Sequence, residues 1–160
     1  MNLMTSEPLG ANLIERYLST RGIRYFRGAH ETEYFYVANS RPYRLHVHLE
    51  ISPVDLEISP EQHELFIRVT PACFFPVSDR PLLSHFADRW NKQDREVTAV
   101  VHESSDPQRV GVVALRSRWI RGGFNVEDVH AFEDFTAFVD CGIAAAIEFF
   151  SELTPVAVSA

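Results

Sequence analysis

The sequence predicts an α+β protein, with three helices and a mainly antiparallel sheet of about five strands in the order α-β-β-β-α-β-β-α. Two observations lead to this prediction. The spacing of apolar residues is helical at the start, in the middle and at the end of the chain, and it alternates in between. Helices and groups of strands are also segregated along the chain, which is typical of this class. With 160 residues, we expect a single domain over residues 1–160 with its core at about 12–153.

The first elements are a helix and three strands. The helix is expected at residues 11–21, and Gly22 follows where a helix would end in a left-handed turn. The three strands are predicted at residues 34–38, 43–51 and 64–70. The second is the clearest, since its apolar residues alternate with polar ones and are Tyr43, Leu45, Val47, Leu49 and Ile51. Residues 54–58 alternate too, but Pro53 and Pro60 bracket them, so they are expected to form an edge strand or an extended loop.

The middle of the chain predicts a second helix and then a hairpin. The helix is expected at residues 79–92, where Ser78 or Asp79 can cap its start. Its apolar residues recur at helical spacing and include Leu82, Phe86 and Trp90. The hairpin has strands at residues 96–103 and 109–120, joined by a short polar loop.

A long third helix is predicted at residues 125–153, with Asn125 as its cap and Pro155 beyond its end. Its apolar side chains cover more than one narrow stripe, and they are Phe132, Phe135, Phe138, Val139, Ile143, Ile147, Phe149, Phe150 and Leu153. One contact with a sheet would leave part of this apolar area exposed to water. We therefore expect a homodimer, with Phe149 and Phe150 as partner-binding residues.

Three local sequences resemble the YbjN-domain family, whose fold is like that of type III secretion chaperones. They are the helix Leu82–Asn91 with its final Trp-Asn step, the strand Glu96–Val100 that follows it, and the run Gly122–Glu127 before the last helix. The resemblance covers about residues 12–153. It implies a small, often dimeric, non-enzymatic protein that is a regulator or holds a partner polypeptide. The family has no catalytic motif from which residues could be transferred to this chain.

Charge and composition limit the classes of partner. The formal net charge is −7, and residues 122–160 hold seven acidic side chains without any lysine or arginine. This acidic end disfavours nucleic-acid and anionic-membrane partners. Because there is neither a secretory signal nor a membrane-length apolar run, we expect a cytoplasmic protein. Cys73 and Cys141 are compatible with one disulfide or with two free thiols in a reducing compartment.

No residue pattern in the sequence carries a recognisable chemistry. His46, His48 and Glu50 share one face of a predicted strand and offer three zinc ligands, but without a fourth we interpret them as a solvated polar face and expect no metal. His85, Asp88 and His130 could form an acid–base group, although no spacing rule selects them. Nucleophile and phosphate-binding motifs are missing, so an enzyme is disfavoured and no cofactor is expected.

Two aromatic segments are candidate contact sites. Arg116, Arg118 and Trp119 form a basic, aromatic-containing stretch of one strand. Its arginines are expected to pair with acids of the last helix, while single-stranded RNA or an acidic protein segment are the alternatives. The adjacent Phe74 and Phe75 lie between prolines and either fill the core below a loop or form an exposed patch, and the first is favoured.

The sequence therefore favours a non-enzymatic, chaperone-like partner-binding or regulatory module. Such a module would use a sheet face or an exposed sheet edge to hold an extended segment of an unidentified protein by strand addition. One alternative is a small-molecule sensor, which requires a closed apolar cavity. The other is an enzyme with a pocket between sheet and helices, which requires convergent titratable groups.

Overall fold

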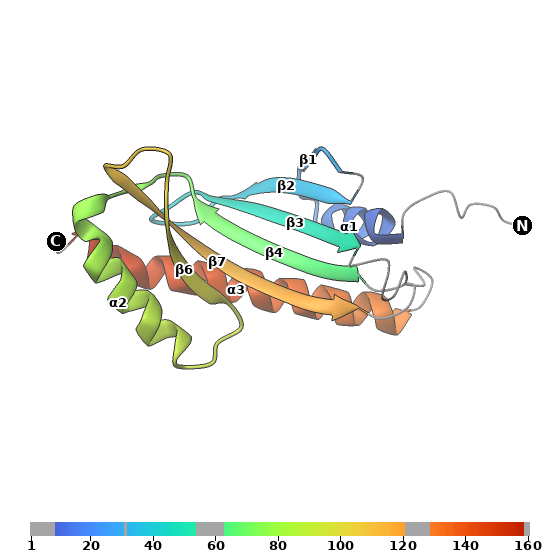
Figure 1. Cartoon of the computed structure of the whole chain (residues 1–160). Helices are drawn as coiled ribbons and strands as arrows, with labels where there is room; N and C mark the ends of the chain where they lie inside the picture. The colour runs from blue at the N-terminus through green and yellow to red at the C-terminus, as the bar shows by residue number, and fades with distance from the viewer. Residues whose placement is uncertain (1–8, 31, 54–62, 121–128, 159–160) are drawn as a thin grey trace, which may run out of the picture. The chain divides into compact units, whose positions relative to one another are not determined.

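The computed structural model describes residues 9–30, 32–53, 63–120 and 129–158 (Figure 1). The helices are α1 (Leu9–Thr20), α2 (Arg80–Asn91) and α3 (Val129–Val158), and a 3-10 turn, η2 (Val77–Asp79), precedes α2. The strands are β1 (Phe26–Arg27), β2 (Glu33–Ala38), β3 (Leu45–Pro53), β4 (His63–Pro71), β5 (Phe75–Pro76), β6 (Thr98–Glu103) and β7 (Arg109–Ile120). The predicted α+β class is confirmed.

Within the described residues, the strands form one seven-stranded sheet in the order β1-β2-β3-β4-β7-β5, and β6 also pairs with β7. The pairings β1/β2, β5/β7 and β6/β7 are antiparallel. The expectation of about five strands in the order α-β-β-β-α-β-β-α is wrong in detail, because β1 and β5 were not predicted. Each has only two residues, which is too short for an alternating pattern to be visible in the sequence.

The contacts within the chain divide it into two compact units. Unit 1 contains residues 1–36, 48–67 and 117–140, and unit 2 contains residues 37–47, 68–116 and 141–160. Strands β2, β3, β4 and β7 and helix α3 contribute residues to both. The single domain over residues 1–160 stays a prediction.

Unit 1 has a core between α1, the inner face of its strands and the first part of α3. Tyr17 of α1 is buried, and its ring meets Phe135 edge-on at 5.8 Å between centroids. The core side chains from the strands include Tyr34, Leu49, Ile51, Leu65 and Ile67. Gly22 ends α1 with a positive φ of 64°, as predicted. The alternation predicted for β3 is confirmed from Leu45 to Ile51, and its polar residues face outward. Tyr43, predicted as the first residue of this strand, lies before β3, which begins at Leu45.

Unit 2 has a core between α2, β6, β7 and the last part of α3. Its centre is an aromatic group in which Phe149 contacts the rings of Phe86, Trp90 and Phe150. Leu83, Ala87 and Trp90 form the buried face of α2. This matches the helical spacing in the sequence, although Asp79 makes no side-chain capping bond.

The ends of α3 differ from the prediction. The helix includes Pro155 and ends at Val158, although the proline was expected beyond its end. A proline inside a helix removes one backbone hydrogen bond and destabilises the helix. Leu153, two residues before Pro155, is fully buried, and this packing stabilises the end of α3. The predicted cap Asn125, the run 122–127 and the segment 54–58 lie outside the described residues.

Among the described helices, none combines the length and the apolar character needed to cross a membrane.

Candidate functional site

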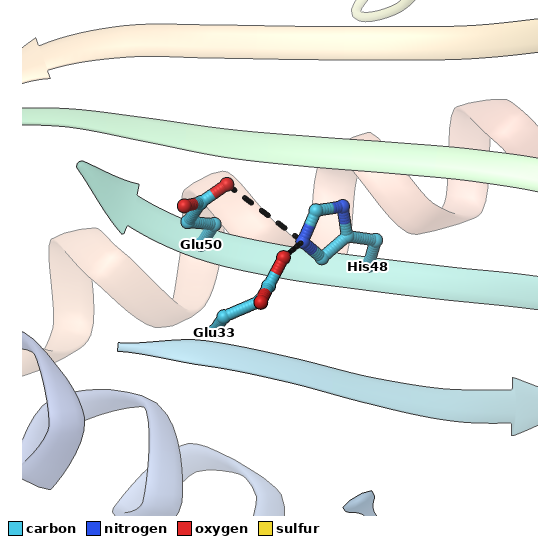
Figure 2. A group of neighbouring side chains, drawn as sticks. All are labelled: Glu33, His48 and Glu50. Carbon is cyan, nitrogen blue, oxygen red and sulfur yellow. Dashed lines mark ion pairs between the residues drawn. The ribbon is translucent and has the colours of Figure 1, made fainter. Parts of the chain in front are cut away.

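A cluster of polar side chains lies on the outward face of β2 and β3 in unit 1 (Figure 2). It consists of Glu33, His48 and Glu50, each of which follows or precedes a buried core residue in its strand. The Nε2 atom of His48 lies 2.9 Å from Oε2 of Glu33 and 3.8 Å from Oε1 of Glu50. The exposed fraction of the side chain is 13% for His48, 14% for Glu33 and 20% for Glu50. The three groups are thus partly shielded from water.

The loop before β2 fixes the carboxylate of Glu33. Its Oε1 atom accepts hydrogen bonds from the backbone N–H groups of Ala29, at 2.9 Å, and His30, at 3.4 Å. Gly28 leaves the space for this carboxylate, because a Cβ atom at Gly28 would lie 2.2 Å from Glu33 Oε1. The backbone N–H of Gly28 donates to the Glu33 carbonyl at 2.7 Å. As a result, Oε1 is held by the loop and Oε2 faces His48.

The electrostatic surroundings favour an ionised Glu33. Burial by itself would raise the pKa of this carboxyl group, but the amides of His30 and Ala29 and the nearby His48 together hold its pKa below the usual value. Glu33 therefore carries its negative charge at neutral pH.

The imidazole of His48 is held by stacking. Its ring lies parallel to the ring of Phe35, with 4.5 Å between centroids and 11° between planes. The Nε2 atom is buried and, among the described residues, it makes no hydrogen bond. The Glu33 oxygen is within ion-pair distance, but it lies off the direction that a ring N–H bond requires. A nitrogen lone pair or proton at this position therefore points into the cluster without an aligned partner.

The sequence pattern indicated two of these three residues, His48 and Glu50, but not Glu33. His48 and Glu50 were grouped with His46, whereas the structure groups them with Glu33. Glu33 is on the preceding strand, so only the register between β2 and β3 brings it to His48. The predicted strand at residues 34–38 did not include Glu33, and no sequence signal indicated the register between the two strands.

His46 instead lines a surface cavity of about 220 Å³ in unit 2. Cys73, Phe74 and His102 are also in its lining. Burial raises the pKa of the Cys73 thiol, so this cysteine is not activated as a nucleophile. Both cysteines of the chain are free thiols. Phe75 is buried as the favoured interpretation predicted, whereas Phe74 is 54% exposed beside the cavity.

The predicted partner-binding residues fall into two groups. Arg118 and Trp119 lie on the exposed end of β7, with Trp119 59% exposed and Arg118 5.7 Å from the ring of Phe138. Arg116 is half-buried. Phe149 and Phe150 are core residues of unit 2, because rings of this chain enclose them, so neither presents a surface to a partner in this structure.

The structure describes two of the three residues that could form an acid–base group, His85 and Asp88. His85 and Asp88 are both exposed on α2 in unit 2. The side chain of His130 lies outside the described part of the chain.

Comparison with solved structures identifies the fold of this chain. No protein-family profile matches this sequence, and no curated protein matches it. Among solved structures, the chain is similar to the crystal structure of YbjN, "a putative transcription regulator from E. coli", with a TM-score of 0.58 and 15% sequence identity. The match covers 91% of this chain and 92% of that chain. At this identity the likeness concerns the backbone alone, and the chain has the YbjN fold that its local sequences resemble.

Proposed function

We propose that this chain is a non-enzymatic binding module that holds an extended, aromatic-containing segment of another protein against the β1 side of its sheet. The observation that carries the proposal is a pair of exposed phenylalanines at that edge. Phe26 of β1 and Phe35 of β2 are direct partners in the strand register, so their side chains lie on the same face. Phe26 is 70% exposed and Phe35 is 38% exposed.

The strand order supports this location. In the described sheet, β1 is the terminal strand, so its outer side is an edge, and its two residues make this edge short. An added strand would gain main-chain hydrogen bonds at this edge, and the two phenylalanines would contact its side chains. A regulatory role agrees with the description of YbjN as "a putative transcription regulator from E. coli", although that description concerns the other protein.

Site-specific photo-crosslinking tests the proposal. A benzoylphenylalanine at position 26 is expected to crosslink to a small set of polypeptides in cells of the native host. The matched control replaces Leu82, an exposed apolar residue of α2 in unit 2. Failure to capture any polypeptide at position 26, or the same set from both positions, would contradict the proposal.

A partner identified in this way allows a quantitative prediction. Replacing both Phe26 and Phe35 by serine is expected to weaken binding of that partner by about tenfold or more, since buried aromatic residues dominate protein interfaces. The thermal unfolding midpoint should change little for Phe26→Ser alone, because Phe26 is mostly exposed in the free protein, whereas Phe35→Ser also removes the stacking of Phe35 on His48. Titration calorimetry with the partner measures the first effect, and circular dichroism measures the second.

The homodimer remains part of the proposal, but the buried phenylalanines of α3 do not provide its surface. Phe135, Phe138, Phe149, Phe150 and Leu153 are all buried within the described chain. If a dimer forms, we expect the exposed Trp119 of unit 1 at its interface, and Trp119→Ser should dissociate it. Light scattering at micromolar concentration decides between a mass of 18.3 kDa and twice that value. A dimer that persists in Trp119→Ser would exclude this interface.

A further inference from the structure

We propose that Glu33, His48 and Glu50 bind one divalent transition-metal ion, for which Zn²⁺ is the probe. The sequence analysis expected no metal because the set His46, His48 and Glu50 had no fourth ligand. The set in the structure is different, since Glu33 replaces His46. The inference concerns unit 1 alone and does not depend on the proposed protein partner.

The distances fit a small ion. One ligand atom from each side chain can be chosen so that all three lie within 4.8 Å of one another. In a four-coordinate zinc site with bonds of about 2.0–2.2 Å, neighbouring ligand atoms lie about 3.3–3.5 Å apart. The observed separations from His48 Nε2, 2.9 Å to Glu33 and 3.8 Å to Glu50, lie on either side of this value. Small rotations of the two carboxylates would therefore complete the geometry, and water can supply the fourth ligand.

The donor types select the class of metal. Calcium and magnesium prefer oxygen ligands alone. One imidazole nitrogen with two carboxylates suits zinc and the neighbouring first-row ions. The two carboxylates also bring two negative charges into a partly buried site, and one divalent ion would neutralise both.

The surroundings hold the ligands in position before a metal arrives. The amides of Ala29 and His30 fix one oxygen of Glu33 and leave the other facing His48. Stacking on Phe35 fixes the plane of the imidazole. Metal-ligating carboxylates and histidines are held in this way by a second layer of contacts. The buried Nε2 atom of His48, which has no hydrogen bond among the described residues, is the atom that the metal would take.

Zinc titration of the untagged, metal-free protein tests the proposal, with a chromophoric chelator as the competitor. One equivalent of Zn²⁺ should bind. His48→Ala and Glu33→Gln should each weaken binding by more than about tenfold, because even the residues behind metal ligands contribute that much. His46→Ala is the matched control, since His46 lies on the same strand and outside the cluster, and it should keep the wild-type affinity.

Two variants, Glu33→Gln and Gly28→Ala, separate metal binding from folding. Glu33→Gln keeps an oxygen that can accept the Ala29 and His30 amides, so its fold should be retained. Gly28→Ala changes no ligand, but its Cβ would displace the Glu33 carboxylate, and a several-fold loss of zinc affinity is expected. Circular dichroism of each variant verifies the fold, and the absorption spectrum of bound Co²⁺ reports the nitrogen and oxygen ligands independently.

The main competing interpretation is a purely internal ion group, in which a protonated His48 bridges the two carboxylates. That interpretation predicts no saturable zinc binding at micromolar concentration. The proposed ligand set would also be contradicted if zinc bound equally well to folded His48→Ala, or if His46→Ala lost zinc as completely as His48→Ala. Any of these results would overturn the proposal.

Discussion

Replacing Phe149 by alanine is expected to lower the free energy of unfolding by about 3–5 kcal/mol, the usual cost of removing a buried phenylalanine. Phe149 is fully buried in unit 2. Its ring centroid lies 5.3 Å from Phe86, 5.1 Å from Trp90 and 5.0 Å from Phe150. Alanine would leave a cavity surrounded by three aromatic rings, which cannot easily collapse into the space.

Urea unfolding, followed by circular dichroism and by tryptophan fluorescence, measures this effect. Phe74→Ala is the matched control, because Phe74 is more than half exposed in the same unit, and we expect it to change the stability by less than about 1 kcal/mol. A cost for Phe149→Ala as small as that of the control would show that Phe149 is not a core residue.

The same burial decides how a charged substitution acts. Phe149→Glu together with Phe150→Glu is expected to unfold the chain, since each carboxylate would be enclosed without a partner. The sequence alone left open whether these changes would break a dimer or the fold. Loss of circular dichroism at every protein concentration identifies unfolding, whereas a folded monomer would show that the two rings lie at an interface.

The regular elements of this fold are predictable because each has a period that the sequence displays. In β3, Val47, Leu49 and Ile51 alternate with polar residues and are all buried. Strands β1 and β5 have two residues each, so their pairing depends on tertiary contacts. The sequence therefore predicted the class and the helices, but neither the strand count nor the exposed Phe26 at the sheet edge.

The candidate site was predictable only in part for a related reason. His48 and Glu50 are two residues apart on one strand, so the period of the strand alone places them together. The position of Glu33 depends on how β2 aligns with β3 and on the space beside Gly28. Phe149 and Phe150 show the converse. Their apolar character was clear from the sequence, but only the packing of α2 against α3 distinguishes a core from an interface.

The Trp-Asn step at the end of α2 carries the second large effect on stability. Figure 1 shows α2 beside β6, and the step joins the two elements. The Trp90 indole N–H donates to the Val97 carbonyl at 2.9 Å. The Asn91 amide donates to the Ala99 carbonyl at 2.9 Å and accepts from the Ala99 N–H at 2.8 Å. Asn91 thus occupies the edge of β6 as a neighbouring strand would, which gives a physical reason for the motif that first indicated the fold.

Asn91→Ala is therefore expected to lower the free energy of unfolding by about 1–3 kcal/mol, since it leaves the N–H and C=O of Ala99 without their side-chain partner. Asn91→Asp should also destabilise, because a carboxylate keeps the acceptor but cannot donate to the Ala99 carbonyl. Urea unfolding measures the cost, and hydrogen exchange should show faster exchange at the Ala99 amide. Gln93→Ala is the control, since the hydrogen bond from its side chain to the Arg89 carbonyl is long, at 3.4 Å, and exposed, and it should cost less than about 0.5 kcal/mol. Equal effects of the alanine changes at positions 91 and 93 would show that Asn91 does not hold the edge of β6.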